Sequence, residues 1–251
     1  MDRHYVSQDM LSLLNNQDYP LTINIVGAGG TGSNVVMSLA KICLALHALG
    51  KSLLSVRVYD GDIITEANIG RQMFFKHDIG RRKSDVLVER INRSYGFSWL
   101  SKGNYPEELD SAANITISCV DTIKSRKAII KTLKENLKRN NHTWITPYYL
   151  IDSGNGLDHG QVIISTVQDI PQPKSKYITH KSLPDIFSLY KTIKEDNTTP
   201  SCSLREALYK QDIMINSFMA DISCQILWQM LTKNYIEKFQ YYINLSKMKL
   251  T

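Results

Sequence analysis

Two kinds of apolar pattern alternate through the first 140 residues of the chain. Short apolar, β-branched runs predict strands near residues 22–26, 54–59, 97–101 and 115–120. Apolar residues that recur every three to four positions predict helices near residues 31–49, 82–94 and 123–139. Strands that alternate with helices favour an α/β fold, in which helices cover both faces of a mainly parallel sheet.

The pattern changes after residue 140. Two β-rich runs, Thr143–Ser153 and Gly160–Val167, are separated by glycine-rich turns and predict an antiparallel hairpin. Residues 168–202 carry four of the seven prolines among polar side chains, which indicates a long crossover loop on the surface. A helix is expected from Leu204 to Thr232, and Phe239–Leu245 is expected to close the sheet as an edge strand.

Length and composition indicate one globular domain. The 251 residues, 43% of them hydrophobic, suffice for one sizeable core. No apolar run is long enough to span a membrane, and the first residues lack the layout of a signal peptide, so we expect a cytoplasmic protein without a membrane partner. The formal charge is +6, but the basic residues are scattered, and the densest cluster, Lys131–Arg139, is typical of a solvated helix face. A nucleic-acid partner is therefore not expected.

A glycine-rich turn, Gly27-Ala-Gly-Gly-Thr-Gly32, joins the first predicted strand to the first predicted helix. Gly27 permits the tight reversal, Gly29 lets a phosphate approach the backbone, and Gly32 lets the helix pack closely on the sheet. Gly30 and Thr31 complete the turn, where N–H groups at the helix N-terminus face an anion. The turn predicts a Rossmann-like nucleotide site; the alternative is a glycine-rich turn without a ligand.

Charged residues after the second predicted strand distinguish between nucleotides. Asp60 can accept hydrogen bonds from ribose hydroxyls, which suits NAD and ATP equally, and Asp62 points the same way in an extended segment. Arg71 and Lys83 have no place in a dehydrogenase, but two cations can stabilise the charge that develops when a carboxylate attacks the α-phosphate of ATP. Alternatively, each of the two is an ordinary surface charge.

These motifs resemble those of the ThiF/MoeB/HesA family, the adenylating fold shared with the ubiquitin-activating enzymes. The matching segments are Asp60-Gly-Asp62, Asn68-Ile-Gly-Arg71-Gln72, Asp78-Ile-Gly80-Arg-Arg-Lys83, and Asp121 after the run Ile115–Val120. Gly70 stands where the family usually has Asn. The resemblance implies one domain over residues 1–251, with a nucleotide-binding part in 1–140 and antiparallel strands, the crossover loop and C-terminal helices in 141–251.

The resemblance also implies roles for single residues. Asp60 would hold the ribose, Asn68, Arg71 and Lys83 the phosphates, with Gln72 beside them, and Asp121 a Mg²⁺ ion that accompanies ATP. Asp121 can also be read as the N-cap of the helix that begins near Ile123. The family forms homodimers in which an arginine from a neighbouring subunit's N-terminal helix reaches the triphosphate. Arg3 is the only arginine in the short N-terminal segment, and we do not expect it to take this role. Arg71 and Lys83 are then more important as cations at the triphosphate.

A closer resemblance is to the ThiF-related proteins of PRTRC plasmid and mobile-element cassettes. It rests on Gly29–Ser33, on Pro200–Ala207 and on Ile215–Ser217. Such cassettes encode a small ubiquitin-like protein, so the resemblance implies ATP-dependent adenylation of a partner's C-terminal carboxylate. Two other readings stay open: a scaffold that binds the ubiquitin-like partner without turning over ATP, and an NAD-dependent oxidoreductase.

The cysteines fall into two groups. In the ThiF-like family the crossover loop delivers a cysteine, here Cys202, and a thiolate at the start of a helix is favoured. Cys202 is therefore a candidate acceptor of the acyl group, and the alternative is an idle thiol beside a capping serine. Cys43, Cys119 and Cys224 sit in apolar stretches and are expected in the core. The chain has no Cys-x-x-Cys pair, so we expect no zinc.

Overall fold

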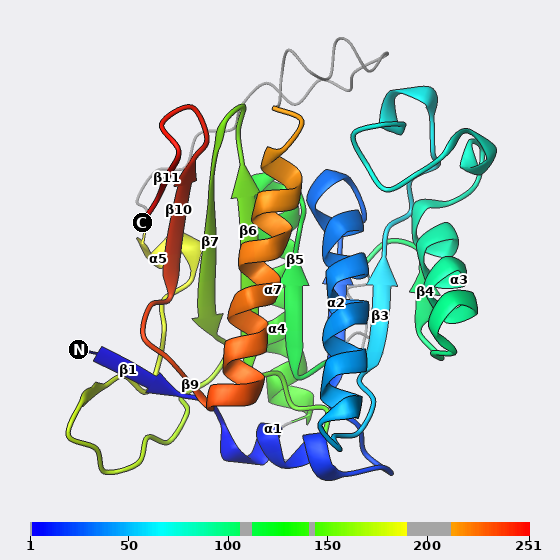
Figure 1. Ribbon diagram of the computed structural model, residues 1–251. Coiled ribbons are helices and arrows are strands. Elements are labelled where there is room, and N and C mark those ends of the chain that lie inside the picture. Colours follow the sequence, from blue (N-terminus) through cyan, green and yellow to red (C-terminus); the bar gives the residue numbers. More distant parts are fainter. Residues whose placement is uncertain (1, 106–111, 141–143, 190–211) are drawn as a thin grey trace.

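The computed structural model describes residues 2–105, 112–140, 144–189 and 212–251, and it is built around one large sheet (Figure 1). The strand order in that sheet is β11-β10-β7-β6-β5-β2-β3-β4. Its strands are β2 (Thr22–Val26), β3 (Ser55–Tyr59), β4 (Leu100–Lys102), β5 (Ile115–Ser118), β6 (Tyr149–Asn155), β7 (His159–Thr166), β10 (Gln240–Asn244) and β11 (Lys249–Leu250). Neighbours from β6 to β4 run parallel, whereas β7, β10 and β11 add antiparallel pairs.

Four long helices cover the two faces of this sheet. They are α2 (Gly30–Ala48), α3 (Lys83–Tyr95), α4 (Ile123–Asn140) and α7 (Ile215–Lys233). Helices α2 and α7 lie side by side on one face, and α4 lies behind the sheet (Figure 1). Successive side chains of β2 point to opposite faces of the sheet. Ile25 belongs to the core under α2 and α7, whereas Val26 packs with Ile129 and Leu133 of α4. No helix among the described residues is long and apolar enough to cross a membrane.

The strand order predicts a crevice in the first half of the molecule. From β2 the chain proceeds outward through β3 to β4, and it then returns to the opposite side of β2 to form β5. In such sheets, ligands bind outside the carboxyl ends of the strands at this point of reversal. The turn after β2 and the loop after β5 therefore flank the same crevice.

A second, three-stranded sheet was not predicted. Strand β1 (Asp2–Tyr5) pairs in parallel with β8 (Ile178–Thr179) and antiparallel with β9 (Tyr235–Ile236). The short helices α1 (Gln8–Ser12) and α5 (Ile186–Leu189), and three 3₁₀ turns, η1 (Leu13–Asn15), η2 (Glu66–Asn68) and η3 (Lys76–Asp78), complete the described elements. The N-terminal segment thus connects the chain before α5 with the chain after α7.

Most predicted elements are confirmed, and the exceptions have physical reasons. The strand expected near 97–101 is the shorter β4, because only Leu100–Lys102 pair with β3, while the buried Phe97 and Trp99 stack in the core before the strand begins. Strand β10 is not the edge strand, since β11 pairs with its outer side. The described part of the crossover, 168–189, contains β8 and α5 and is anchored by buried Ile170, Leu183 and Ile186. The prediction of an unpacked surface loop was wrong for this part, and residues 190–202 lie outside the described chain.

Candidate active site

The glycine turn after β2 is shaped by close backbone contacts. Gly27 has φ of +90°, and its N–H donates to the carbonyl of Tyr59 over 2.8 Å. A Cβ at Gly27 would lie 2.8 Å from the carbonyl oxygen of Cys119, and a Cβ at Gly32 would collide with the carbonyl of Gly27. A side chain at either position would force the backbone to shift, which agrees with the predicted roles in the reversal and in helix packing.

The two central glycines have different surroundings. A Cβ at Gly29 would meet only the amide nitrogen of Gln72, at 4.0 Å, whereas a Cβ at Gly30 would run into the side chain of Asn216 on α7. The first N–H groups of α2 have no partner within the helix. The turn is therefore closed on the Gly30 side and has room for a ligand above Gly29.

Asp60 follows β3 and is partly buried beside this turn. Its Oδ2 accepts a hydrogen bond from the N–H of Ala28 over 2.6 Å, and its Oδ1 accepts one from the N–H of Asp62 over 2.9 Å. Burial raises the pKa of Asp60, although nearby Lys83 opposes the rise. The carboxylate is thus held against the glycine turn, where it can accept from a ribose.

Lys83, the first residue of α3, is nearly buried and forms an ion pair. Its Nζ lies 2.8 Å from Oδ2 of Asp62, whose side chain is 73% exposed. The N–H of Lys83 also donates to the carbonyl of Asp62 over 3.0 Å. Lys83, the predicted phosphate-binding cation, is therefore paired with Asp62, the second predicted acid. Lys83 can contact a phosphate only if it also keeps, or breaks, its ion pair with Asp62.

The Asn68–Gln72 segment returns to α2. The side-chain oxygen of Asn68 accepts from the N–H of Thr65 over 2.8 Å and caps a 3₁₀ turn, so its amide nitrogen is the part that can donate to a phosphate. The N–H of Met73 donates to the hydroxyl of Ser33 in the first turns of α2. Burial lowers the pKa of Arg71, and the buried Gln72 faces the space above Gly29.

Asp121 lies in the loop after β5, with an exposed side chain. Thr122, not Asp121, caps α4, because the hydroxyl of Thr122 accepts from the N–H of Ser125 over 3.1 Å. The reading of Asp121 as the N-cap was wrong. Asp121 follows the carboxyl end of β5 and lies two residues after Cys119, whose backbone lies against Gly27.

Arg126 and Asp152 hold the loop that carries Asp121. The guanidinium of Arg126 forms a buried ion pair with Asp152 of β6, and its Nη2 donates to the carbonyls of Val120 over 2.8 Å and of Ser153 over 3.0 Å. A planar guanidinium that reaches three acceptors fixes their relative positions. Asp152 was not among the predicted site residues, because it reaches this loop only through the pairing of β6 with β5.

A magnesium ion would find one protein ligand here. Within the described residues no three His, Cys, Asp or Glu side chains gather as a metal site. Mg²⁺ at nucleotide sites is commonly held by one or two carboxylates together with phosphate oxygens and water. The exposed carboxylate of Asp121 therefore fits an ion that arrives with a triphosphate.

The described cysteines are packing residues. Cys43, Cys119 and Cys224 carry free thiols, and Cys43 and Cys224 are buried. Burial raises the pKa of Cys43 and of Cys224 to about 12, so neither is a thiolate at neutral pH. The expected core positions are confirmed for these two. Cys202 lies outside the described residues.

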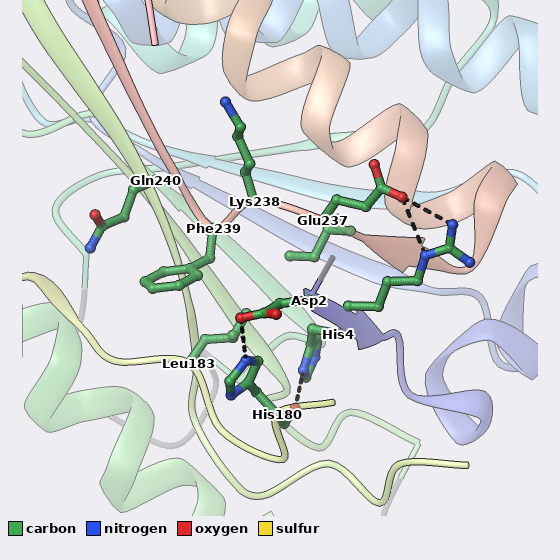
Figure 2. A pocket seen from close by; sticks show the side chains of 10 residues that line it. Asp2, His4, His180, Leu183, Glu237, Lys238, Phe239 and Gln240 are labelled. Carbon is green, nitrogen blue, oxygen red and sulfur yellow. Dashed lines mark hydrogen bonds and ion pairs between the residues drawn. The ribbon is translucent and has the colours of Figure 1, made fainter. Parts of the chain in front are cut away.

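Arg3 lies far from the glycine turn of the same chain. Its guanidinium pairs with Glu237 at 3.0 Å and lies between the rings of Tyr177 and Tyr235. The three-stranded sheet that holds it borders a hollow of about 210 Å³, in which His180 lies against Asp2 and Phe239 forms one side (Figure 2). This sheet adjoins the C-terminal end of α7, whereas Gly30 contacts the N-terminal end, roughly 28 Å away by helix rise.

The architecture and the crevice define a Rossmann-like α/β nucleotide-binding class of protein. The model of the ThiF family matches residues 19–251, and the chain therefore belongs to the ThiF family. No curated protein matches the chain in a sequence search.

Solved structures show the same fold at low identity. PaaA is 14% identical with a TM-score of 0.60, over 97% of this chain and 65% of PaaA. E. coli MccB with ATP is 15% identical with a TM-score of 0.58, over 97% and 65%. The microcin C7 biosynthetic enzyme MccB, in complex with N-formylated MccA, is 17% identical with a TM-score of 0.54, over 97% and 66%. This chain spans just under two thirds of the length of each.

Proposed function

We propose that the chain uses ATP and Mg²⁺ to adenylate a carboxylate. One observation carries the proposal: the contact of Gly27 with the Cys119 carbonyl brings the glycine turn to the loop that carries Asp121. Asp60 and Lys83 border the same turn from β3 and α3. A ribose acceptor, a phosphate turn, a buried cation and an exposed acid around one crevice are the groups that ATP activation needs, and NAD binding gives no reason for the last two.

Each side chain then has a separate task. Asp60 accepts from the ribose, and the N–H groups of the α2 N-terminus, with Gly29 below them, bind the phosphates. Arg71 and Lys83 balance the charge that develops as a carboxylate attacks the α-phosphate and pyrophosphate leaves, while Asn68 and Gln72 donate hydrogen bonds. Asp121 would hold Mg²⁺, which would neutralise phosphate charge when bound. Alignment and charge stabilisation are the main contributions, because a carboxylate is already a nucleophile.

The carboxylate that we propose is the C-terminus of a ubiquitin-like or sulfur-carrier-like protein. The resemblance of Gly29–Ser33 and Ile215–Ser217 to PRTRC-cassette proteins supports this choice. MccB, which has the same fold, has been solved with ATP and with MccA, so this architecture accommodates a nucleotide and a second molecule. We further propose that the protein acts as a homodimer in the cytoplasm.

A transfer step to Cys202 follows in this proposal. The Cys202 thiolate attacks the acyl carbon of the adenylate, a thioester forms, and AMP leaves with the electrons of the broken acyl–phosphate bond. The three other cysteines cannot replace it, since burial keeps the Cys43 and Cys224 thiols protonated and raises the pKa of Cys119.

Pyrophosphate exchange tests the proposal. Purified chain, ATP, Mg²⁺ and a ubiquitin-like protein are incubated with labelled pyrophosphate, and label should enter ATP only when the partner's C-terminus is intact. A partner that lacks its last two residues is the matched control. ATP binding without exchange would favour the scaffold reading, and NAD binding without ATP binding would favour the oxidoreductase. A reductant-sensitive adduct that Cys202→Ser removes, while exchange continues, supports the transfer step.

A further inference from the structure

The closed side of the glycine turn is formed by one residue of α7. Asn216, the second residue of that helix, is 3% exposed, and its Oδ1 accepts a hydrogen bond from the hydroxyl of Thr31 over 3.2 Å. The same oxygen lies 3.4 Å from Nδ2 of Asn155, the last residue of β6. Its side chain also fills the space that a Cβ at Gly30 would need. Three segments that are distant in sequence therefore meet at one amide.

This contact sets the direction of the Thr31 side chain. A hydroxyl in the first turn of a phosphate-binding helix can point to the ligand, but here it is 6% exposed at the residue level and donates to α7. The N–H groups of that first turn are then the donors that remain for an anion. Their aim depends on how the first turn of α2 is held against α7.

The rest of the α7 interface supports a fixed geometry. The hydroxyls of Ser153 on β6 and Ser223 on α7 lie 2.7 Å apart, and both residues are buried. Buried polar side chains stabilise a fold only when they are paired, and paired groups specify one arrangement. The polar seam therefore fixes the register of α7 on β6, and with it the position of Asn216.

We propose that Asn216 is a positioning residue for the triphosphate: it acts through Thr31 and Gly30 to aim the N-terminal N–H groups of α2. The inference rests on the proposed function, because it needs ATP at this turn. It assigns to Asn216 a part in phosphate binding but none in contacting the adenosine.

Binding of two ligands separates positioning from general damage. ATP and adenosine are titrated calorimetrically against the wild type, Asn216→Ala, Thr31→Val and the double variant. We expect Asn216→Ala to weaken ATP about tenfold and adenosine less than twofold. Because Asn216 acts through Thr31, the double variant should be no weaker for ATP than Asn216→Ala alone. Ser217→Ala, which removes a hydroxyl that donates to the Met214 carbonyl over 2.9 Å, is the neighbouring control and should match the wild type.

The outcomes are distinct. Equal ATP affinity in the wild type and Asn216→Ala overturns the inference and leaves the proposed function standing. A parallel loss of ATP and adenosine affinity overturns the inference in favour of a purely structural role. If Asn216→Ala does not fold, the same comparison of ATP with adenosine is made with Thr31→Val, which keeps the size of the side chain. A wild type that binds no ATP removes the proposed function, and the inference with it.

Discussion

The Nζ of Lys83 lies 2.8 Å from Oδ2 of Asp62, and the two ends of this ion pair have opposite exposure. The Lys83 side chain is 8% exposed and that of Asp62 is 73% exposed. A buried ammonium needs a partner, whereas a solvated carboxylate can exchange its partner for water. Asp62 therefore holds Lys83 in a position from which a more highly charged phosphate can take it over.

Lys83→Met should remove the cation with little change in volume. We expect the rate of pyrophosphate exchange at saturating ATP to fall roughly 100-fold or more, because a preorganised charge at the reacting phosphate is lost. Asp62→Asn, the partner control, keeps the cation and should retain most of that rate. Exchange by Lys83→Met at the wild-type rate would show that Lys83 serves only the ion pair.

Asp60→Asn tests the ribose assignment through pH. Burial raises the pKa of Asp60, so the folded protein holds the proton more tightly than the unfolded chain. The cost of ionising this group is absent below the unfolded pKa and is complete above the folded pKa, so ligand-free stability falls as pH rises through that interval. ATP affinity should change in the opposite direction and weaken as pH falls through the folded pKa, because the ribose needs a strong acceptor.

In Asp60→Asn this pH dependence of ATP binding should disappear. At neutral pH the variant should bind ATP about 10- to 100-fold more weakly, the range expected when hydrogen bonds to a charged acceptor are lost. Calorimetric titrations of both proteins across mildly acidic pH measure the effect. An unchanged pH profile in the variant would assign the titration to another group.

Asp121 and Thr122 are adjacent residues with separable tasks. Asp121→Ala should abolish pyrophosphate exchange, because the proposed Mg²⁺ ligand is lost, while the melting temperature stays near that of the wild type. Thr122→Ala removes the cap of α4 and should cost about 1 kcal/mol of stability, or about 2–4 °C in melting temperature, with exchange retained. Exchange by Asp121→Ala near the wild-type rate would contradict the magnesium assignment.

Local patterns predicted the parallel part of the fold well, because most of its elements are long helices or largely buried strands. The run 22–26 was predicted with the bounds of β2, all of whose residues are buried. Strand β1 was missed, since four residues carry little pattern and its partners β8 and β9 lie more than 170 positions away. The predicted position of β10 at the edge of the sheet was wrong for the same reason, because the edge strand is β11, which has only two residues.

The candidate site shows the same division. The turn at Gly27 and the position of Asp60 beside it could be predicted, because both follow from local backbone geometry after a strand. The ion pair of Lys83 with Asp62 was not predicted, because the two residues are 21 positions apart and no sequence pattern links their charges. No local pattern predicts the position of Asn216. Its contacts, Gly30 and Thr31, are 185 or more positions away in the sequence and meet it only because α7 packs on α2.

Gly29 and Gly32 offer the sharpest comparison within the phosphate turn. A methyl group at Gly29 would meet only the amide nitrogen of Gln72, at 4.0 Å, whereas one at Gly32 would collide with the backbone of Gly27. Gly29→Ala should therefore fold with a nearly unchanged melting temperature but bind ATP at least tenfold more weakly, because the methyl group occupies the space into which a phosphate comes. Gly32→Ala should lose about 2–3 kcal/mol of stability, or about 4–12 °C in melting temperature, because the backbone of the reversal must shift. Thermal unfolding with and without ATP measures both effects, and ATP should raise the melting temperature of Gly32→Ala but not that of Gly29→Ala. If ATP protects Gly29→Ala as fully as the wild type, the phosphates do not lie above Gly29.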